Sequence, residues 1–457
     1  MSWSITRVVA PLVASSLVMA LGVAVAAQQQ STGTVGTTPG TPLSAEASDP
    51  RVMGWMQGFP PPKDKLITQP ESDYFSFPKL RWSVCHLRQL MPTVGISRGL
   101  DPAVPLRYLP APELERAGRE IDALTFTPLN SDQPMTWEQS LSANYTDGML
   151  IIHKGQVVYE RYFGCLDPAG KHAAMSMTKS LTGLLAEILV AEGKLDPTAP
   201  VTQYVPEVAQ SAFGTATVQQ VMDMTTGIDY SEDYSDPNAG IWQYSAAASP
   251  LPKPAGYQGP IGYYEALEQI KPAGRNGEAF HYATPNADML GWIVSRASNT
   301  SIPALASERL WQPMGAEQDA YMTVDFYGTA FAGGGLSAGL RDMGRIGLLM
   351  LNEGVINGKR LFPAKAVERI RAGGDPAKFG TNYPALIGGS YTGLWWVYPG
   401  QDEVVAARGV YGQTIYVDWD ADMVLVRFAS LPNASNPLND PTSLPAYAAV
   451  ANYLKSR

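Results

Sequence analysis

The sequence of 457 residues has few of the residues that metal centres and disulfide frameworks require. It contains two cysteines, Cys85 and Cys165, which are too few for a disulfide scaffold or a cysteine-ligated zinc site. An oxidising compartment would allow them to form one disulfide, and two separate buried thiols are an equal alternative. The four histidines show no metal-ligand spacing: His86, His153, His172 and His281. We therefore expect neither a metal nor an organic cofactor.

Positive charge is also scarce, because 33 Lys and Arg face 42 Asp and Glu, which gives a formal net charge of -9. No run of basic residues interrupts this balance, and this argues against nucleic acid or an anionic membrane as a partner. Hydrophobic residues make up 45% and charged residues 16%, which is typical of globular rather than disordered chains. The length is sufficient for two or three domain-sized units, and the composition leaves the oligomeric state open.

Long apolar runs are absent apart from one near the N-terminus. Residues Val8 to Val25 are mostly apolar and small, Arg7 precedes them, and Ala24-Val25-Ala26 matches the small-x-small cleavage pattern. We predict a signal peptide over residues 1–27 and a flexible leader, rich in Gln, Thr, Ser, Gly and Pro, over residues 28–50. An uncleaved membrane anchor is the alternative, since the run is nearly long enough to span a bilayer. Cleavage would yield an exported protein, periplasmic or extracellular, without a membrane span.

The remaining chain divides into an arm and a main body. Residues 51–135 carry many prolines and aromatics with little periodicity, which favours an irregular N-terminal arm packed on residues 136–457. Within the main body, Gly148 to Tyr162 has the pattern of a β-hairpin, and Ser176 to Glu192 has apolar residues at helical spacing. Residues of about 198–285 favour short helices and loops. Strands on both sides of this helical middle indicate an α/β protein with an inserted, mostly helical lobe.

Further elements follow from the same patterns. Thr284 is expected to be the N-cap of a helix with Pro285 at its first position. The other segments expected to be regular are a helix over Leu340 to Asn352, strands over Leu394 to Tyr398, Val404 to Tyr411, Ile415 to Trp419 and Met423 to Phe428, and a terminal helix over Ala446 to Lys455.

Two serines match the G-x-S-x-G pattern of a nucleophile elbow, and both lack its context. The elbow places serine between a strand and a helix, whereas Ser97 is surrounded by prolines. Ser337 is followed by a predicted helix, but the elbow's triad needs a histidine later in the chain, and none follows His281. Neither serine is therefore favoured as a nucleophile.

Ser176 and Lys179 form the S-x-x-K pattern at the start of the predicted helix. Residues three apart lie on one face of a helix, so the Lys179 amine can reach the Ser176 hydroxyl. The helix N-terminus also offers free N–H groups and a positive dipole end where an oxyanion could form. Ser76 and Lys79 have the same spacing, but Pro78 between them argues against helical geometry. An ordinary helix start with a solvated lysine is the alternative interpretation of Ser176 and Lys179.

Tyr282 belongs to a Y-x-T pattern immediately before the helix predicted at Thr284. A tyrosine close to a lysine ammonium can have its pKa lowered and exchange protons with the serine and a leaving group. Tyr321 and Tyr327 match the same pattern in weaker contexts, and a core aromatic is the alternative for Tyr282.

Several longer segments, taken together, resemble a known family. SMTKSLTGLLAEILVAEGKLDPTAPVTQYVPE resembles the nucleophile helix of serine β-lactamase-like (penicillin-recognising) hydrolases. DMTTGIDYSEDYSDP, FHYATPNADMLGWIVSRAS, FAGGGLSAGLRDMGRIGLLML and GVYGQTIYVD resemble more closely the 6-aminohexanoate-dimer (nylon-oligomer) hydrolases and related esterases. The resemblance covers about residues 75–455 and implies a β-lactamase/transpeptidase-like fold, with an antiparallel sheet flanked by helices, for the domain over residues 136–457.

The resemblance also implies roles for individual residues. Ser176 would be the acylated nucleophile, Lys179 its base, and Tyr282 the group that relays a proton to the leaving group. The Ser176 N–H and a backbone N–H near Val410 would form the oxyanion hole. The resemblance further assigns three residues to substrate binding: Tyr234, Trp242 and Tyr411.

This sequence departs from the family at the third motif. Where β-lactamases carry Lys-Thr-Gly or a similar triplet, this chain reads Ala407-Arg408-Gly409-Val410-Tyr411-Gly412-Gln413, so the lysine is missing and Arg408 is its expected partial substitute. Tyr411 stands where the nylon-oligomer enzymes have histidine. An uncharged substrate depends least on these groups. We therefore expect a serine hydrolase that cleaves a small ester or amide through an acyl-enzyme on Ser176. A β-lactamase or D-alanyl peptidase, and a catalytically silent binding protein with the same fold, are the alternatives.

Overall fold

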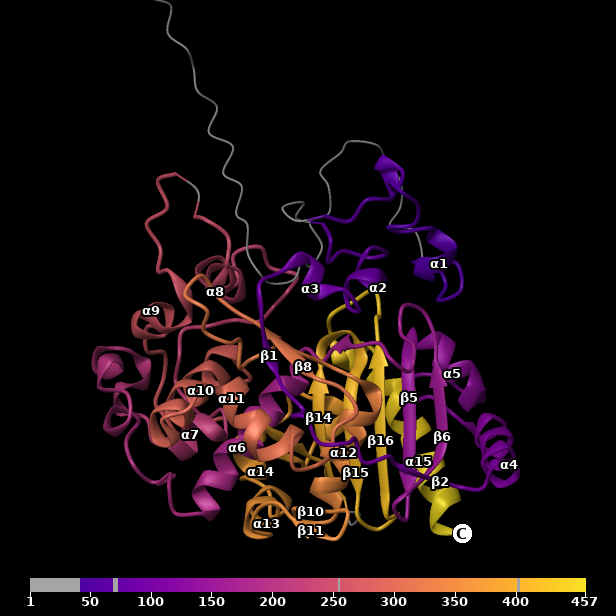
Figure 1. Cartoon of the computed structure of the whole chain (residues 1–457). Coiled ribbons are helices and arrows are strands. Elements are labelled where there is room, and N and C mark those ends of the chain that lie inside the picture. The colour runs from indigo at the N-terminus through magenta and orange to yellow at the C-terminus, as the bar shows by residue number, and fades with distance from the viewer. Residues whose placement is uncertain (1–41, 69–72, 254, 401–402) are drawn as a thin grey trace, which may run out of the picture.

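A large sheet runs through the centre of the protein in the computed structural model, which describes residues 42–68, 73–253, 255–400 and 403–457 (Figure 1). Within these residues the sheet has eight strands, in the order β12 (Ser390–Thr392), β13 (Trp395–Val397), β14 (Val404–Gly409), β15 (Gln413–Asp418), β16 (Met423–Ala429), β5 (Thr146–His153), β6 (Gln156–Tyr162) and β2 (Arg107–Tyr108). Neighbours are antiparallel except β2 and β6, which are parallel. The predicted signal peptide lies outside the described residues, as does the leader up to residue 41.

Both faces of the central sheet are covered by helices, which explains why its inner strands β5 and β16 are buried at every position. On one face lie α6 (Met177–Ala191), α12 (Leu340–Leu351) and α13 (Lys365–Arg371). On the other face lie α4 (Ala111–Asp122), α5 (Trp137–Ala143) and α15 (Asp440–Lys455). Alternate residues of one strand serve the two cores: Leu150 and Ile152 pack with the first group, Met149 and Ile151 with the second.

A second sheet leads the chain into α6. Its order is β1 (Thr93–Ile96), β8 (Ala320–Thr323), β9 (Leu336–Ala338) and β7 (His172–Ala173), with antiparallel pairs throughout. Two short hairpins complete the strands of the described residues: β3 (Thr125–Phe126) with β4 (Met135–Thr136), and β10 (Val355–Ile356) with β11 (Lys359–Arg360).

The predicted helical lobe is built from short helices. Residues 198–285 contain η2 (Val201–Gln203), η3 (Pro206–Gln210), η4 (Ala212–Thr215), α7 (Val218–Met222), α8 (Gly240–Ala248) and α9 (Gly262–Gln269). They pack beside α10 (Thr284–Ser298), which is followed by α11 (Ile302–Ala306) and the π-helical turn η5 (Ser307–Trp311). The lobe lies beside the sheet, on the left in Figure 1. The mixed α/β fold with a mostly helical insertion is therefore confirmed.

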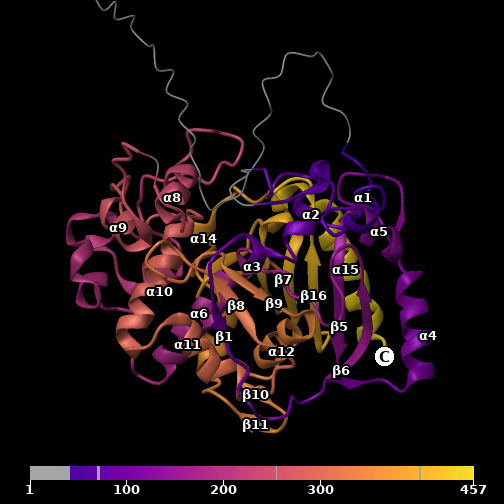
Figure 2. The same cartoon turned by 45° about the horizontal axis from the view of Figure 1, so that its top comes forward.

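The segment over residues 51–135 is more regular than the sequence predicted. It contains α1 (Pro50–Met53), η1 (Lys63–Lys65), α2 (Leu80–Ser83) and α3 (Leu87–Leu90), and its β1 and β2 pair with strands of the main body. The prediction missed the twelve-residue helix α4, whose buried Ala117, Gly118 and Ile121 lie on one face. Figure 2 shows α2 and α3 next to β7, where the Val84 carbonyl accepts a hydrogen bond from Ala173 N at 2.8 Å.

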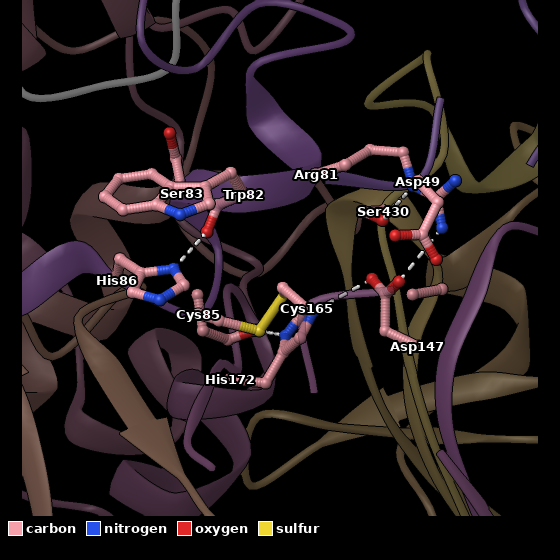
Figure 3. Close-up of a disulfide and its surroundings, with 12 residues drawn as sticks. Asp49, Arg81, Trp82, Ser83, Cys85, His86, Asp147, Cys165, His172 and Ser430 are labelled. Carbon is pink, nitrogen blue, oxygen red and sulfur yellow. Dashed lines mark hydrogen bonds and ion pairs between the residues drawn. A yellow bond between two sulfur atoms is a disulfide. The ribbon is translucent and has the colours of Figure 1, made fainter. Parts of the chain in front are cut away.

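A disulfide between Cys85 and Cys165 fastens the arm to the segment before β7 (Figure 3). It joins residues 80 apart in the sequence, and it decides the question that the cysteine count left open. Beside it, the buried Arg81 donates to Asp147 at 3.1 Å, and the same carboxylate lies 3.2 Å from His172 Nε2. The arm is thus held both covalently and by a buried charged network.

Most of the predicted helices and strands of the main body are present with boundaries shifted by a few residues. β5 and β6 form the expected antiparallel hairpin, and the long helix begins after Ser176. The N-cap prediction was wrong, because α10 begins at Thr284 and the cap position is Ala283. Four short elements lie in the later loops: α14 (Pro376–Phe379), η6 (Pro384–Leu386), η7 (Val410–Gly412) and η8 (Asn436–Leu438). Among the described residues, no helix has the length and hydrophobicity that crossing a bilayer requires.

Helix α6 packs so closely on the β12–β13 turn that it depends on one glycine. A Cβ on Gly183 would meet the Gly393 carbonyl oxygen well inside van der Waals contact. Ser180 Oγ also donates to Leu394 O at 2.8 Å, and Trp395 Nε1 donates to Ser180 O at 2.9 Å. The backbone of this turn therefore cannot withdraw without losing these hydrogen bonds.

We predict that Gly183→Ala destabilises the protein, although alanine normally stabilises a helix relative to glycine by about 0.5–1 kcal/mol. Overpacking of this kind costs about 1–3 kcal/mol or more. Thermal unfolding of the purified variant measures the effect as a lowered Tm. The control is Gly118→Ala in α4, where the nearest atom is the mobile end of Arg161 and stability should be unchanged or higher. Equal Tm values for the two variants would contradict the close approach.

Candidate active site

The chain enters helix α6 through a tight backbone turn that presents Ser176. β7 ends at Ala173, and Met175 has a left-handed φ of 48°, which is uncommon for a side chain of its size. Such conformations concentrate at functional sites, where the surrounding structure enforces them. Ser176 occupies the N-cap position of α6 and is 9% exposed. Its hydroxyl therefore lies at the positive end of the helix.

Lys179 lies one turn into α6, and its amine contacts the Ser176 hydroxyl. Nζ lies 2.8 Å from Ser176 Oγ and 2.7 Å from the carbonyl oxygen of Gly333, and the side chain is buried. A neutral amine can donate to the Gly333 carbonyl while its lone pair accepts the proton of Ser176. The predicted contact between Ser176 and Lys179 is thus present in the geometry that proton abstraction needs.

Burial lowers the pKa of Lys179, because the charged amine cannot be solvated in this position. Glu232 and Asp288 act in the opposite direction, with Glu232 the stronger. Asp288 itself is buried, and this desolvation raises its pKa to about 7 even though Tyr244 donates to it at 2.8 Å. Its other oxygen accepts from Gly333 N at 2.9 Å, so Asp288 and Lys179 bind the two ends of the same glycine.

Tyr282 lies over Lys179, with the ammonium nitrogen 5.2 Å from the ring centroid. The ring also stacks on Trp396, with 5.5 Å between the ring centroids. Burial raises the pKa of Tyr282, the negative charge of Glu232 adds to this rise, and a hydrogen bond with Ser176 opposes it. The expectation that the nearby lysine lowers this pKa was therefore wrong. Tyr282 stays a neutral phenol that can donate a proton.

Glu232 is the acidic residue that the sequence analysis overlooked. Its two oxygens accept hydrogen bonds from Thr284 N at 2.6 Å and Thr284 Oγ1 at 2.7 Å. The carboxylate thus caps the start of α10, which explains why the Thr284 hydroxyl does not. It also accepts from the Tyr234 hydroxyl at 3.2 Å. The signal in the sequence was its place two residues before Tyr234 in SEDYSDP.

The strand β14 places Gly409 directly against the start of α6. A Cβ on Gly409 would lie 3.0 Å from Ser176 N and 2.7 Å from Ala174 O, so a side chain here would displace the nucleophile turn. Val410 follows and lines the same cavity as Ser176. The structure therefore brings together the two backbone segments from which the sequence predicted an oxyanion hole.

Gln413 holds the segment that contains Val410. Its side-chain nitrogen donates to Val410 O at 3.1 Å and to Ala429 O at 2.6 Å, and its side-chain oxygen accepts from Ala429 N. Between them, Tyr411 has a left-handed φ of 63° and packs edge-on against Phe75 at 6.0 Å. Both backbone segments at the site thus contain a residue in the left-handed region, Met175 and Tyr411.

The predicted substrate-binding residues occupy different places. Tyr234 and Tyr411 line a wide cleft of about 1380 Å³, together with Tyr282. Tyr234 also lines a smaller cavity of about 80 Å³, which contains Ser176 and Lys179. Trp242 lines neither of these cavities and instead packs edge-on against Tyr234, 6.2 Å between ring centroids.

Arg408, the expected substitute for the missing lysine, is already paired. It is buried, forms an ion pair with Asp440, and lies 5.3 Å from the ring centroid of Trp396. Although it lines the wide cleft, its charge is compensated by Asp440. A substrate carboxylate would have to compete with this partner.

The alternative nucleophiles lie in less suitable surroundings. Ser97 is exposed after the edge strand β1, and Ser337 is fully buried within β9. In the second S-x-x-K pattern, Lys79 binds Asp73 at 2.7 Å, and Ser76 donates to Asp73 O at 2.6 Å.

One group of possible metal ligands occurs in the described part of the chain: Cys85, Cys165 and His172, with donor atoms within 4.8 Å of one another. The two sulfurs are bonded to each other (Figure 3), so neither is available as a thiolate. The imidazole nitrogens lie 2.9 Å from Ala173 O and 3.2 Å from Asp147 Oδ2. This arrangement fits a structural crosslink and does not fit a metal centre.

The fold and the buried serine–lysine pair define the class of the protein, a serine hydrolase. The Beta-lactamase family model matches residues 144–448, and the chain belongs to this family. The 6-aminohexanoate-dimer hydrolase of Paenarthrobacter ureafaciens is 35% identical over 361 residues, which are 78% of this chain and 86% of that enzyme.

Solved structures show the same relationship. A protein described provisionally as a 6-aminohexanoate-dimer hydrolase from Bacillus anthracis superposes with a TM-score of 0.74 at 29% identity, covering 84% of this chain and 96% of its own. EstCE1, a hydrolase with promiscuous acyltransferase activity, shares the fold at a TM-score of 0.52 and 14% identity, covering 75% and 99%. The chain is thus similar to the 6-aminohexanoate-dimer hydrolases within its family.

The electrostatics of the site predict the pH dependence of hydrolysis. If neutral Lys179 is the base, log kcat/KM rises with pH through the lowered lysine pKa. Glu232→Gln removes the charge that raises the pKa of Lys179, so this rising limb of the profile should move to lower pH. The glutamine can still accept from Thr284 N and donate to Thr284 Oγ1.

Asp233→Asn is the matched control for this pH profile. Asp233 lines the wide cleft next to Glu232 but is exposed, so solvent screens its charge from Lys179. The rising limb should keep its position in this variant. Superimposable profiles for Glu232→Gln and the wild type would contradict the assigned influence of Glu232.

Proposed function

We propose that this protein hydrolyses small, uncharged carboxylic esters through an acyl-enzyme on Ser176. The contact that carries the proposal is the 2.8 Å approach of Lys179 Nζ to Ser176 Oγ in a buried site. Neutral Lys179 takes the hydroxyl proton as Ser176 Oγ attacks the carbonyl carbon. The Ser176 and Val410 N–H groups stabilise the oxyanion, and the helix dipole favours the same negative charge.

Collapse of the tetrahedral intermediate releases the alcohol or amine. Tyr282 is a neutral phenol, and its position over Lys179 allows it to donate a proton to the leaving group and recover one from the lysine ammonium. Water then attacks the acyl-enzyme, and the same groups return Ser176 to its hydroxyl form.

Linear amides of amino acids are the second candidate substrates. The acidic Glu232 and Asp233 line the wide cleft, where they would attract a substrate ammonium group. The 35% identical relative is named as a 6-aminohexanoate-dimer hydrolase, which supports this class. The β-lactamase alternative is less well supported, because the charge of Arg408 is compensated by Asp440. A silent binding protein would not need a buried lysine against the serine hydroxyl.

The test combines turnover with covalent labelling. The purified protein should hydrolyse a short nitrophenyl ester, and a fluorophosphonate probe should label Ser176, as mapped by mass spectrometry. Ser176→Ala should abolish both turnover and labelling. Lys179→Ala should lower kcat/KM by about 10²–10⁴-fold, the range typical of acid–base catalysis. Ser97→Ala is the control and should keep both activities.

Each other outcome has a distinct meaning. A folded protein without turnover or label would favour the binding-protein alternative. A label on Ser97 or Ser337 would show that Ser176 is not the nucleophile. Faster turnover of a penicillin analogue than of the ester would favour the β-lactamase alternative.

We also propose that the protein is exported and that residues 1–27 are removed. The Cys85–Cys165 disulfide supports this proposal, because such bonds persist in oxidising compartments outside the cytoplasm. Expression of the full chain in a bacterial host, fractionation and N-terminal sequencing provide the test. The expected product begins after residue 27 in the periplasm or medium, and a cytoplasmic product that retains residues 1–27 would contradict it.

A further inference from the structure

The small cavity beside Ser176 is lined in part by the N-terminal arm. Four arm residues line it: Tyr74, Phe75, Leu87 and Met91. All four are at least nine-tenths buried, and the one polar group among them, the Tyr74 hydroxyl, contacts Met91 Sδ at 3.6 Å. The arm thus presents an apolar wall to the nucleophile. These residues lie outside the segment 144–448 that matches the family model.

We propose that this cavity, here named the acyl pocket and bounded by Tyr74, Phe75, Leu87 and Met91, binds the acyl chain of the substrate and restricts it to short, uncharged chains. The proposal rests on the ester or amide hydrolysis proposed above.

The position of Tyr282 assigns the two cavities to the two halves of the substrate. A leaving group must lie next to its proton donor, and Tyr282 lines the wide cleft. Ser176 lines the small cavity, and Tyr282 is not among the residues that line it. Tyr234, Phe75 and Val410 line both and mark the boundary. A carbonyl held at this boundary directs its leaving group into the wide cleft and its acyl chain into the acyl pocket.

The volume of the acyl pocket limits the chain. It measures about 80 Å³, whereas an engineered apolar cavity of about 150 Å³ accommodates benzene and one water occupies about 30 Å³ in the liquid. About three carbon atoms therefore fit without rearrangement. A charged group on the acyl chain would lose its hydration against an apolar wall, so charged acyl groups are disfavoured.

The arm is fastened close to the nucleophile, so the wall cannot move away freely. Val84 accepts the backbone hydrogen bond of Ala173, three residues before Ser176. The next residue, Cys85, forms the disulfide to Cys165, and Arg81 binds the buried Asp147 (Figure 3). These attachments directly precede Leu87 and Met91 in the chain and so hold this part of the arm near the start of α6.

The experiment measures kcat/KM for nitrophenyl acetate, butyrate, hexanoate and octanoate, which share one leaving group and differ in acyl length. For the wild type, we expect octanoate to react at least about tenfold more slowly than butyrate, because one unaccommodated methylene costs about tenfold or more. Met91→Ala and Leu87→Ala enlarge the pocket and should raise the octanoate-to-butyrate ratio at least about tenfold. Met53→Ala, in the same arm but not lining the pocket, should leave the ratio unchanged.

Two outcomes distinguish failure of the acyl pocket from failure of the proposed hydrolysis. Equal ratios in the wild type and both enlarged variants, with normal butyrate turnover, would overturn the acyl pocket and leave the proposed hydrolysis intact. Absence of turnover for all four esters in the wild type would overturn the proposed ester hydrolysis and the pocket with it. Two controls distinguish a changed pocket from a loosened arm. Thermal unfolding of each variant measures whether the arm has been destabilised. The conservative variant Met91→Leu keeps the side-chain volume and should therefore keep the wild-type octanoate-to-butyrate ratio.

Discussion

The burial of the Lys179 amine is the constraint on which the site depends. A lysine in a dry environment loses the hydration of its ammonium form, so its pKa falls and a larger fraction is the neutral amine at a given pH. The fold supplies two contacts for it, the Ser176 hydroxyl and the Gly333 carbonyl, both within 2.8 Å. The nucleophile helix and Gly333, in the loop before β9, meet at this group. Each would leave an unsatisfied polar atom if it were displaced.

Two carboxylates raise the pKa of Lys179 and so oppose the lowering caused by burial. Glu232 caps α10 and faces Lys179, and Asp288 binds Gly333 from the other side. In the proposed mechanism, both carboxylates stabilise the lysine ammonium that forms as Ser176 attacks the substrate. Tyr282, kept neutral by burial, would then carry the proton to the leaving group. The arm, which lies outside the segment that matches the family model, adds an apolar wall beside the nucleophile.

The local part of the site could be predicted from the sequence, and the part built by tertiary contacts could not. Ser176 and Lys179 are three residues apart on one helix, so their contact follows from helical geometry. Glu232 contacts Thr284, 52 residues later, and Arg408 contacts Asp440, 32 residues later. The spacing of residues along the sequence does not predict contacts over such separations. The same limit explains the wrong N-cap at Thr284, whose hydroxyl binds Glu232 instead. The hairpin at β5–β6 and the helix α6 were predictable from alternation and helical spacing, whereas the pairing of β1 with β8 was not.

The pKa of Lys179 in the resting protein tests this account most directly. Lysine labelled with ¹³C at Cε reports the protonation of each amine by NMR, and the Lys179→Met variant identifies the resonance of Lys179. The account predicts that this resonance titrates below the ordinary lysine value of 10.5, as a result of burial. A Lys179 that titrates at or above 10.5 would be an ammonium throughout the working range. It could then not accept the proton of Ser176, and the proposed acyl-transfer mechanism would be wrong.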